Sequence, residues 1–239
     1  MQPQSEEKSF DPDLTINFFT MSIYAANLSF LLRKNELSAG KISAELGIKD
    51  LAHPLPDDIK HIASRFSVTT DLLLKTDIEL REEQRSKEIK LVIFDVDGVL
   101  TDTGIYYTEN GDEFKKFNAK DGLAIRRLSK VGVIQTGIIS HGFTNKLIAR
   151  RAEVLRIAHV EVSQTPKLET LTKWCAALNI SPANICFIGD DVNDQEIIRA
   201  VGFSACPADA VDEVKNLVHV VLSKKGGDGA VRELIDLYL

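Results

Sequence analysis

The feature that most constrains this chain is an apolar run that ends in two aspartates and a glycine. Residues 91–94 are Leu-Val-Ile-Phe, and Asp95, Asp97 and Gly98 follow directly. Such a run is typical of a buried strand, and residues two apart in an extended chain share a face. Both carboxylates can therefore point into one site at the carboxyl end of the strand, where open α/β sheets bind ligands.

These two carboxylates also constrain the chemistry of the site. Asp95 and Asp97 repel each other when both are ionised, so the arrangement needs a cation or a proton. A hard ion such as Mg²⁺ prefers oxygen ligands and usually accompanies a phosphate group. The sequence Asp-x-Asp-Gly also occurs in calcium loops and turns, but the apolar strand before it does not suit a calcium loop.

The run from Phe94 to Val99 resembles the first motif of the haloacid-dehalogenase-type phosphatases. The resemblance implies that Asp95 is the nucleophile and Asp97 the general acid/base. The other motifs of that family follow in order. Ser140 ends an apolar stretch and matches the second motif, and Lys167 opens a helical pattern and matches the third. The resemblance implies that Ser140 and Lys167 bind phosphate.

The acidic run of residues 189–194 matches the fourth motif of the same family. The resemblance implies a Mg²⁺ site formed by Asp95, Asp97 and Asp190, with Asp191 and Asp194 in support. Taken singly, Ser140 and Lys167 could be an ordinary loop serine and a solvated lysine, and the aspartates could form a loop and a helix N-terminus. The order and spacing of all four motifs favour the phosphatase.

Within that family, further segments resemble the 3-deoxy-octulosonate 8-phosphate phosphatase group, which includes relatives that act on nine-carbon sialic-type acid phosphates. The resemblance covers roughly residues 88–239 and implies a capless α/β domain, a homotetramer and a β-hairpin flap over the site. It also implies a phosphorylated 3-deoxy-ulosonic acid as substrate, used for surface polysaccharide such as lipopolysaccharide. The matching segments are residues 103–107, 110–111, 117–122 and 226–233.

We expect substrate contacts from Asn118, Asp121 and His141. After the serine of the second motif the group usually has Gly and then Arg or Glu, whereas this chain has His141 and Gly142. His141 could contact the sugar acid, carry a proton or fill space. The missing charge at Gly142 leaves the identity of the sugar acid open.

Apolar strand patterns alternate with helical patterns through the second part of the chain, which predicts a doubly wound parallel sheet. Asn110-Gly111 predicts a hairpin with a type I′ turn. Strands are expected at residues 90–95, 133–140, 159–162, 185–190, 203–206 and 218–222. Helices are expected at residues 122–130, 144–155, 167–178, 194–200, 210–216 and 229–238.

Residues 1–86 form a different, all-α domain in this interpretation, and residues 87–239 form the phosphatase domain. After a loose polar start over residues 1–13, helices are expected at residues 18–32, 39–46, 56–66 and 70–74, followed by a charged linker over residues 79–90. The pattern resembles a repressor-type helix-turn-helix, yet only residues 49–54 stand where a recognition helix should follow Ile48.

Charge and composition narrow the possible partners. Residues 1–86 contain ten basic and fourteen acidic side chains, and the whole chain has a net charge of −6, which does not favour nucleic-acid binding. We find no secretory signal and no apolar run of about 20 residues that could cross a bilayer. Three cysteines in apolar segments indicate buried thiols in a reducing cytoplasm.

Three alternatives to a sugar-acid phosphatase stay open at this point. The enzyme could act on another sugar phosphate, which a substrate panel would decide. The chain could be a helix-turn-helix regulator that uses the phosphatase-like domain as a sensor, which would require a basic recognition surface. It could also be a catalytically silent interaction module, although the complete set of aspartates argues against this.

Overall fold

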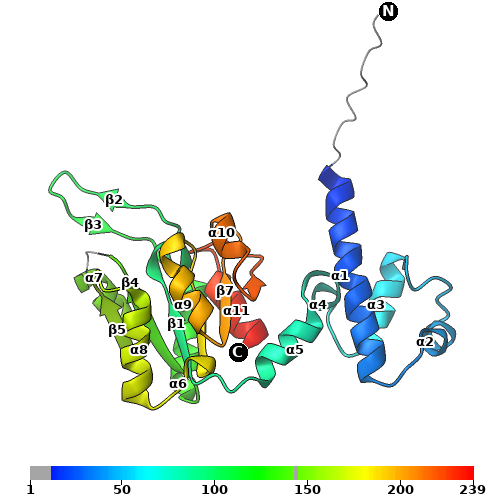
Figure 1. The fold of residues 1–239 in the computed structure, drawn as a ribbon. Helices are drawn as coiled ribbons and strands as arrows, with labels where there is room; N and C mark the ends of the chain where they lie inside the picture. Colours follow the sequence, from blue (N-terminus) through cyan, green and yellow to red (C-terminus); the bar gives the residue numbers. More distant parts are fainter. Residues whose placement is uncertain (1–11, 143–144) are drawn as a thin grey trace, which may run out of the picture. The chain divides into compact units, whose positions relative to one another are not determined.

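The computed structural model describes residues 12–142 and 145–239 and divides the chain into two compact units, Met1–Glu83 and Gln84–Leu239 (Figure 1). This division falls three residues before the end of the predicted first domain, inside helix α5 (Ile78–Ser86). The predicted loose segment lies mostly outside the described residues. Among the described residues, no helix is long and apolar enough to span a membrane.

The first unit is helical, as predicted, and its helix ends follow local signals. The Ser38 side chain accepts a hydrogen bond from the Lys41 amide and begins α2, and Gly47 ends it in the left-handed conformation at φ 68°. Ile48 to Leu55 form bends and irregular backbone instead of a recognition helix. The helices are α1 (Pro12–Lys34), α2 (Ala39–Leu46), α3 (Pro56–Arg65), α4 (Thr70–Lys75) and α5.

The second unit is built on a six-stranded parallel sheet in the order β5-β4-β1-β6-β7-β8, which confirms the predicted α/β fold. Because β4 and β6 flank β1 in parallel, the residues that follow these three strands meet at one edge. The strands are β1 (Leu91–Phe94), β4 (Gln135–Ser140), β5 (His159–Val162), β6 (Ile185–Ile188), β7 (Phe203–Cys206) and β8 (Val220–Val221).

Helices cover this sheet on both faces. α8 and α9 lie in front of the strands in Figure 1 and share a core with β1 and β6, while α6 packs against α7 and α11. The predicted start of α7 at residue 144 lies outside the described residues. The helices are α6 (Ala119–Val131), α7 (Asn145–Leu155), α8 (Lys167–Leu178), α9 (Gln195–Ala200), α10 (Asp212–Lys215) and α11 (Ala230–Tyr238).

A two-stranded hairpin, β2 (Tyr106–Tyr107) and β3 (Glu113–Phe114), extends from the segment between β1 and α6 (Figure 1). The described residues between β1 and α6 contain this hairpin and no inserted cap domain. The prediction of a type I′ turn is wrong, because Gly111 has φ 84° but Asn110 does not have the positive φ that this turn requires. Instead, Thr108 and Asp112 close a three-residue loop in which the Gly111 amide donates to the Thr108 carbonyl at 3.0 Å.

Candidate active site

The first aspartate stands where the sheet ends. Asp95 follows β1 in an extended conformation and is 5 % exposed, and its Oδ1 accepts a hydrogen bond from the Val96 amide at 2.7 Å. Two residues past Val96 the chain turns at Gly98, which has φ 79°. A Cβ at Gly98 would lie 1.9 Å from Oδ2 of Asp190, so glycine is required for the close approach of these two loops.

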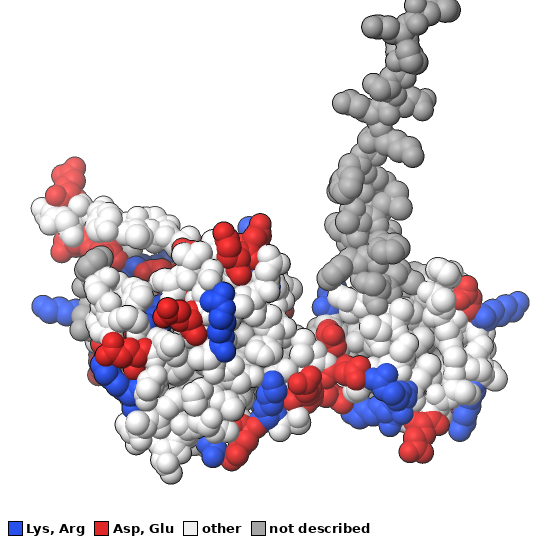
Figure 2. Space-filling model, in the orientation of Figure 1, with Lys and Arg blue, Asp and Glu red and all other residues white. Residues whose placement is uncertain are grey.

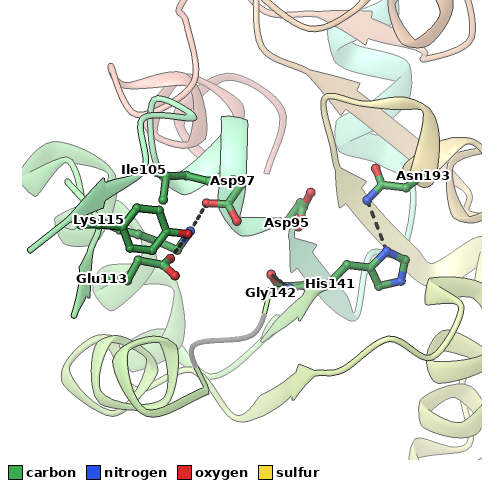
Figure 3. A pocket seen from close by; sticks show the side chains of 10 residues that line it. Asp95, Asp97, Ile105, Glu113, Lys115, His141, Gly142 and Asn193 are labelled. Carbon is green, nitrogen blue, oxygen red and sulfur yellow. Dashed lines mark hydrogen bonds and ion pairs between the residues drawn. The ribbon is translucent and has the colours of Figure 1, made fainter. Parts of the chain in front are cut away.

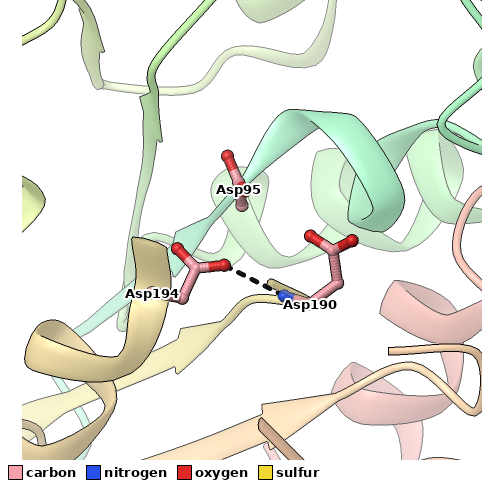
Figure 4. A group of neighbouring side chains, drawn as sticks. All are labelled: Asp95, Asp190 and Asp194. Carbon is pink, nitrogen blue, oxygen red and sulfur yellow. Dashed lines mark hydrogen bonds between the residues drawn. The ribbon is translucent and has the colours of Figure 1, made fainter. Parts of the chain in front are cut away.

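Three carboxylates converge at this edge of the sheet. Ligand oxygens of Asp95, Asp190 and Asp194 all lie within 4.8 Å of one another (Figure 4). Asp194 is fully buried, and its Oδ2 accepts hydrogen bonds from the backbone amides of Asp190 at 3.0 Å and Asp191 at 3.4 Å. Asp194 thereby fixes the loop after β6, and this loop positions Asp190.

One buried lysine forms ion pairs with two of these carboxylates. Lys167 is 2 % exposed, and its Nζ lies 2.8 Å from Asp95 Oδ2 and 2.5 Å from Asp194 Oδ1. Burial favours the neutral amine, but attraction to Asp95 and Asp194 outweighs this effect and raises the pKa of Lys167. The ammonium therefore stays charged and can offset only one of the three carboxylates.

The negative charge that Lys167 does not offset contributes to raised pKa values of Asp95 and Asp190. Burial raises the pKa of Asp95 to about 7, and the repulsion by Asp194 adds to this shift while Lys167 opposes it. Burial, followed by repulsion from the neighbouring carboxylates, raises the pKa of Asp190 to about 8. The site therefore fits a divalent cation, because a hard ion with oxygen ligands would compensate the charge that Lys167 leaves.

The second aspartate, which we also predicted to bind the metal, lies outside this cluster of three carboxylates. Asp97 Oδ1 lies 2.6 Å from Nζ of Lys115, which comes from the segment after β3 and also pairs with Glu113 at 3.0 Å. The acidic cluster therefore contains Asp194 in place of Asp97. The Lys115 side chain is 3 % exposed, and its two acidic partners outweigh the effect of burial and raise its pKa.

A pocket of about 290 Å³ opens beside these groups (Figure 3). Ser140, at the end of β4, is 3 % exposed, and its Oγ accepts a hydrogen bond from the Gly142 amide at 3.2 Å. The hairpin closes one side of the pocket, and the loops after β4 and β6 form the other. The lining residues are Asp95, Asp97, Ile105, Tyr107, Glu113, Lys115, Ser140, His141, Gly142 and Asn193.

Two of the predicted substrate contacts lie elsewhere. Asn118 caps α6 by accepting from the Lys120 amide at 2.7 Å, and its Nδ2 donates to the Gly227 carbonyl at 3.2 Å. Asp121 is 1 % exposed and accepts from the amides of Gly229 at 3.2 Å and Arg232 at 2.7 Å. These partners hold the start of α11, so in this structure both residues have structural roles outside the pocket.

Of the other two candidates from the sequence, His141 and Asp191, only His141 lines the pocket. Asp191 is exposed, and its side chain accepts from the Val192 amide at 2.7 Å, so it caps a short turn outside the acidic cluster. Sequence reasoning missed Lys115 and Asn193. If the alternation of β3 continues by one residue, Lys115 shares a face with Glu113, and this is the signal that could have indicated Lys115.

Comparisons with known proteins identify relatives of this chain. A family model described as haloacid dehalogenase-like hydrolase matches residues 142–234. The 3-deoxy-D-manno-octulosonate 8-phosphate phosphatase of Yersinia pestis is 41 % identical over 156 residues, which is 65 % of this chain and 82 % of that protein. The enzyme of the same name from Escherichia coli K12 is 39 % identical over 155 residues, 65 % of this chain and 81 % of that protein.

Solved structures extend the comparison to bound groups. The crystal structure of the Yersinia pestis enzyme has a TM-score of 0.62 and 40 % identity, covering 65 % of this chain and 83 % of that one. The Moraxella catarrhalis enzyme was solved with magnesium, phosphate and KDO, the 3-deoxy-octulosonate sugar. That structure has a TM-score of 0.63 and 34 % identity, covering 67 % of this chain and 90 % of that one.

Proposed function

This chain belongs to the haloacid dehalogenase-like hydrolases, within the group of 3-deoxy-D-manno-octulosonate 8-phosphate phosphatases, and the enzymes of this group are phosphoric monoester hydrolases. From this we propose that it removes phosphate from a 3-deoxy-ulosonic sugar acid with Mg²⁺. KDO 8-phosphate is the first candidate substrate. The observation that carries the proposal is the largely buried cluster of Asp95, Asp190 and Asp194 with Lys167, next to a pocket large enough for a sugar.

The chemistry follows from two carboxylates with different surroundings. Asp95 attacks the phosphorus atom, and the bond from phosphorus to the sugar oxygen breaks as the aspartyl-phosphate forms. Asp97 gives a proton to the leaving oxygen and then takes one from the water that attacks the phosphorus. This second step releases phosphate and regenerates the Asp95 carboxylate. Asp97 suits the proton transfers because its side chain is 39 % exposed, whereas that of Asp95 is 8 % exposed.

The other residues of the site stabilise charge on the transferring phosphoryl group. Ser140 supplies a hydroxyl and Lys167 an ammonium at the edge of the sheet where Asp95 lies. Asp95 and Asp190 would hold the Mg²⁺ ion, which when bound supplies Lewis-acid stabilisation of the phosphoryl oxygens. Asp194 orients this site through Lys167 and the backbone amide of Asp190.

A substrate panel tests the proposal. The full chain should hydrolyse phosphates of eight- and nine-carbon 3-deoxy-ulosonic acids with Mg²⁺, and it should be inactive in excess chelator. The panel should include ordinary hexose phosphates, because preference for one of these would assign the pocket to another sugar phosphate. Full activity in the chelator would contradict the metal site, and inactivity on every phosphate ester would favour a silent interaction module.

We also propose that a second copy of the chain covers the hairpin, within a homotetramer. An isolated two-stranded hairpin has marginal stability in water, and large apolar side chains on the hairpin and its base are half exposed or more. They are Ile105 at 53 %, Tyr106 at 50 %, Tyr107 at 65 % and Phe114 at 50 %. Sedimentation analysis should give a tetramer, and a stable, active monomer would contradict this proposal.

We infer that the N-terminal unit serves self-association or partner binding in a cytoplasmic protein. Several of its basic side chains are already paired with acidic ones, and Figure 2 shows both charges interspersed on the face drawn. This pattern does not favour a DNA-binding regulator, because DNA binding needs free cations for phosphate. The pairs are Arg33–Glu79, Lys34–Glu82, Lys60–Asp57 and Arg65–Glu45. Three buried free thiols, Cys175, Cys186 and Cys206, support the cytoplasmic location.

A further inference from the structure

The imidazole of His141 connects two loops across the rim of the pocket (Figure 3). Its Nε2 lies 3.0 Å from the carbonyl oxygen of Thr165, and its Nδ1 lies 3.3 Å from Nδ2 of Asn193. A carbonyl oxygen can only accept, so Nε2 carries the proton and donates to Thr165. Nδ1 of the neutral ring then has a lone pair, which accepts a hydrogen bond from the Asn193 amide group.

These contacts use both nitrogens of the ring. The backbone of His141 is also held, because Nε2 of Gln164 donates to its carbonyl oxygen at 2.6 Å. The imidazole therefore has no nitrogen left for a substrate, in contrast to the direct contact that the sequence suggested. Its position is fixed, and the group that it can influence is the side chain of Asn193.

The hydrogen bond from Asn193 also fixes which way its carboxamide faces. The amino group must point toward Nδ1, and a reversed amide would place two acceptors against each other. Figure 3 shows the carboxamide oxygen of Asn193 turned away from the imidazole, and Asn193 lines the same pocket as Asp95 and Asp97. The rim thus presents a hydrogen-bond acceptor in a fixed orientation.

We propose that His141 is a positioning residue that holds the Asn193 carboxamide so that its oxygen binds a hydroxyl group of the leaving sugar. The substrate class rests on the proposed function, and the link between the two side chains does not. An amide oxygen cannot bond to the oxygens of an ionised phosphate, since both are acceptors. A sugar hydroxyl, which donates, is the complementary group that the proposed substrate supplies in this pocket.

A double-mutant cycle in the full-length chain with Mg²⁺ tests this proposal. We expect His141→Ala and Asn193→Ala each to raise KM for the best substrate of the panel by roughly 5- to 10-fold, the size of one hydrogen bond, with a smaller change in kcat. The double variant should lose no more than either single variant, because His141 acts through Asn193. Losses that multiply would overturn the proposal.

Two conservative variants sharpen the cycle. In His141→Asn the side-chain oxygen can lie near the former position of Nδ1 and accept from Asn193, so this variant should recover much of the lost affinity. In His141→Gln the terminal amide can reach Thr165 instead, so this variant should behave like His141→Ala. Recovery by glutamine and not by asparagine would show that the anchor to Thr165 matters and would overturn the role of Asn193.

A measurement without substrate separates this inference from the proposed function. The ¹⁵N signals of the His141 ring in the wild-type protein should identify the neutral tautomer with the proton on Nε2, and the Nδ1 signal should move in Asn193→Ala. A proton on Nδ1 would overturn the inference even if the enzyme hydrolyses KDO 8-phosphate. If no sugar-acid phosphate of the panel is hydrolysed, the proposed function fails, while the predicted tautomer would still support the link.

Discussion

Buried polar groups have opposite consequences in the two units of this chain. In the helical unit, Asn27 is 1 % exposed. Its Nδ2 donates to the carbonyls of Leu73 at 2.9 Å and Thr76 at 2.8 Å, and its Oδ1 accepts from the Ile78 amide at 2.9 Å. In the second unit, three aspartates share the single ammonium of Lys167. One unit satisfies its buried polar group fully, and the other leaves charge uncompensated.

The comparison distinguishes a stabilising polar group from a functional one. Asn27 ties α1 to α4 and to the start of α5, and because its partners are all protein groups, it needs no ligand. The aspartate cluster is stable only when a cation or protons offset its charge.

The largest effect is expected from Asp95→Asn. The amide is a poor nucleophile, so kcat should fall by about 10³-fold or more. Removing one buried negative charge should leave the fold intact and should stabilise the protein in chelator. Kinetic assays and thermal unfolding of the same preparation check both parts. Asp212→Asn is a matched control, because its side chain is 90 % exposed on α10, and retained turnover in Asp95→Asn would contradict the mechanism.

A smaller loss is expected when the partner of Asp97 is removed. Lys115→Met keeps much of the buried volume but leaves Asp97 and Glu113 without their shared ammonium, so kcat/KM should fall roughly 10- to 100-fold. The pH profile of kcat should change as well, because Asp97 transfers protons. Lys116→Met is the control, since Lys116 is 65 % exposed and pairs with Asp102. Equal effects of the two variants would show that Lys115 has no special role.

The part of the fold that the sequence predicted well rests on local signals. The bounds of α2, α8, β5 and β7 agree with the expected ranges, because caps, apolar periodicity and strand length are all encoded within a few residues. The Ser38 cap and the left-handed Gly47 illustrate this for α2. The convergence of Asp95, Ser140 and Asp190 also followed from the parallel order of their strands.

What sequence reasoning missed depends on contacts between distant segments. Asp121 lies in a motif that suggested substrate binding, but its partners are amides near the C-terminus, Gly229 and Arg232. The pairing of Asp97 with Lys115 depends on how the hairpin folds over the site. For the same reason, the link from His141 to Asn193 joins two loops about fifty residues apart and could not be found from local patterns.

On the other side of the comparison, Asn27→Ala should destabilise the helical unit without changing catalysis. The variant leaves two buried carbonyls and one amide without partners, which should cost about 2–4 kcal/mol. Unfolding in urea checks this, and kcat/KM should stay within about twofold of wild type. Asn35→Ala removes an exposed side chain in the turn directly after the same helix and should have little effect. A large loss of activity in Asn27→Ala would show that the helical unit contributes to the site.

The smallest effect concerns the pH dependence of the metal-free protein. The pKa is raised to about 7 for Asp95 and about 8 for Asp190, from 3.8 in the unfolded chain. Between about pH 4 and pH 8 the native state thus holds protons that the unfolded state has released, so the free energy of unfolding should fall as pH rises through this window. A loss of about 1 kcal/mol in the free energy of unfolding across this window would lower Tm by roughly 2–4 °C in a chain of this size.

Thermal unfolding in chelator at pH 5 and pH 8 measures this difference. Mg²⁺ should reduce it, because the ion replaces the protons as the compensating charge, and Asp190→Asn should reduce it in chelator by removing one of the titrating groups. The helical unit provides an internal reference, since Asn27 does not titrate. A Tm in chelator that rises between pH 5 and pH 8, with no response to Mg²⁺ or to Asp190→Asn, would show that the aspartate cluster is compensated by the protein itself, as Asn27 is.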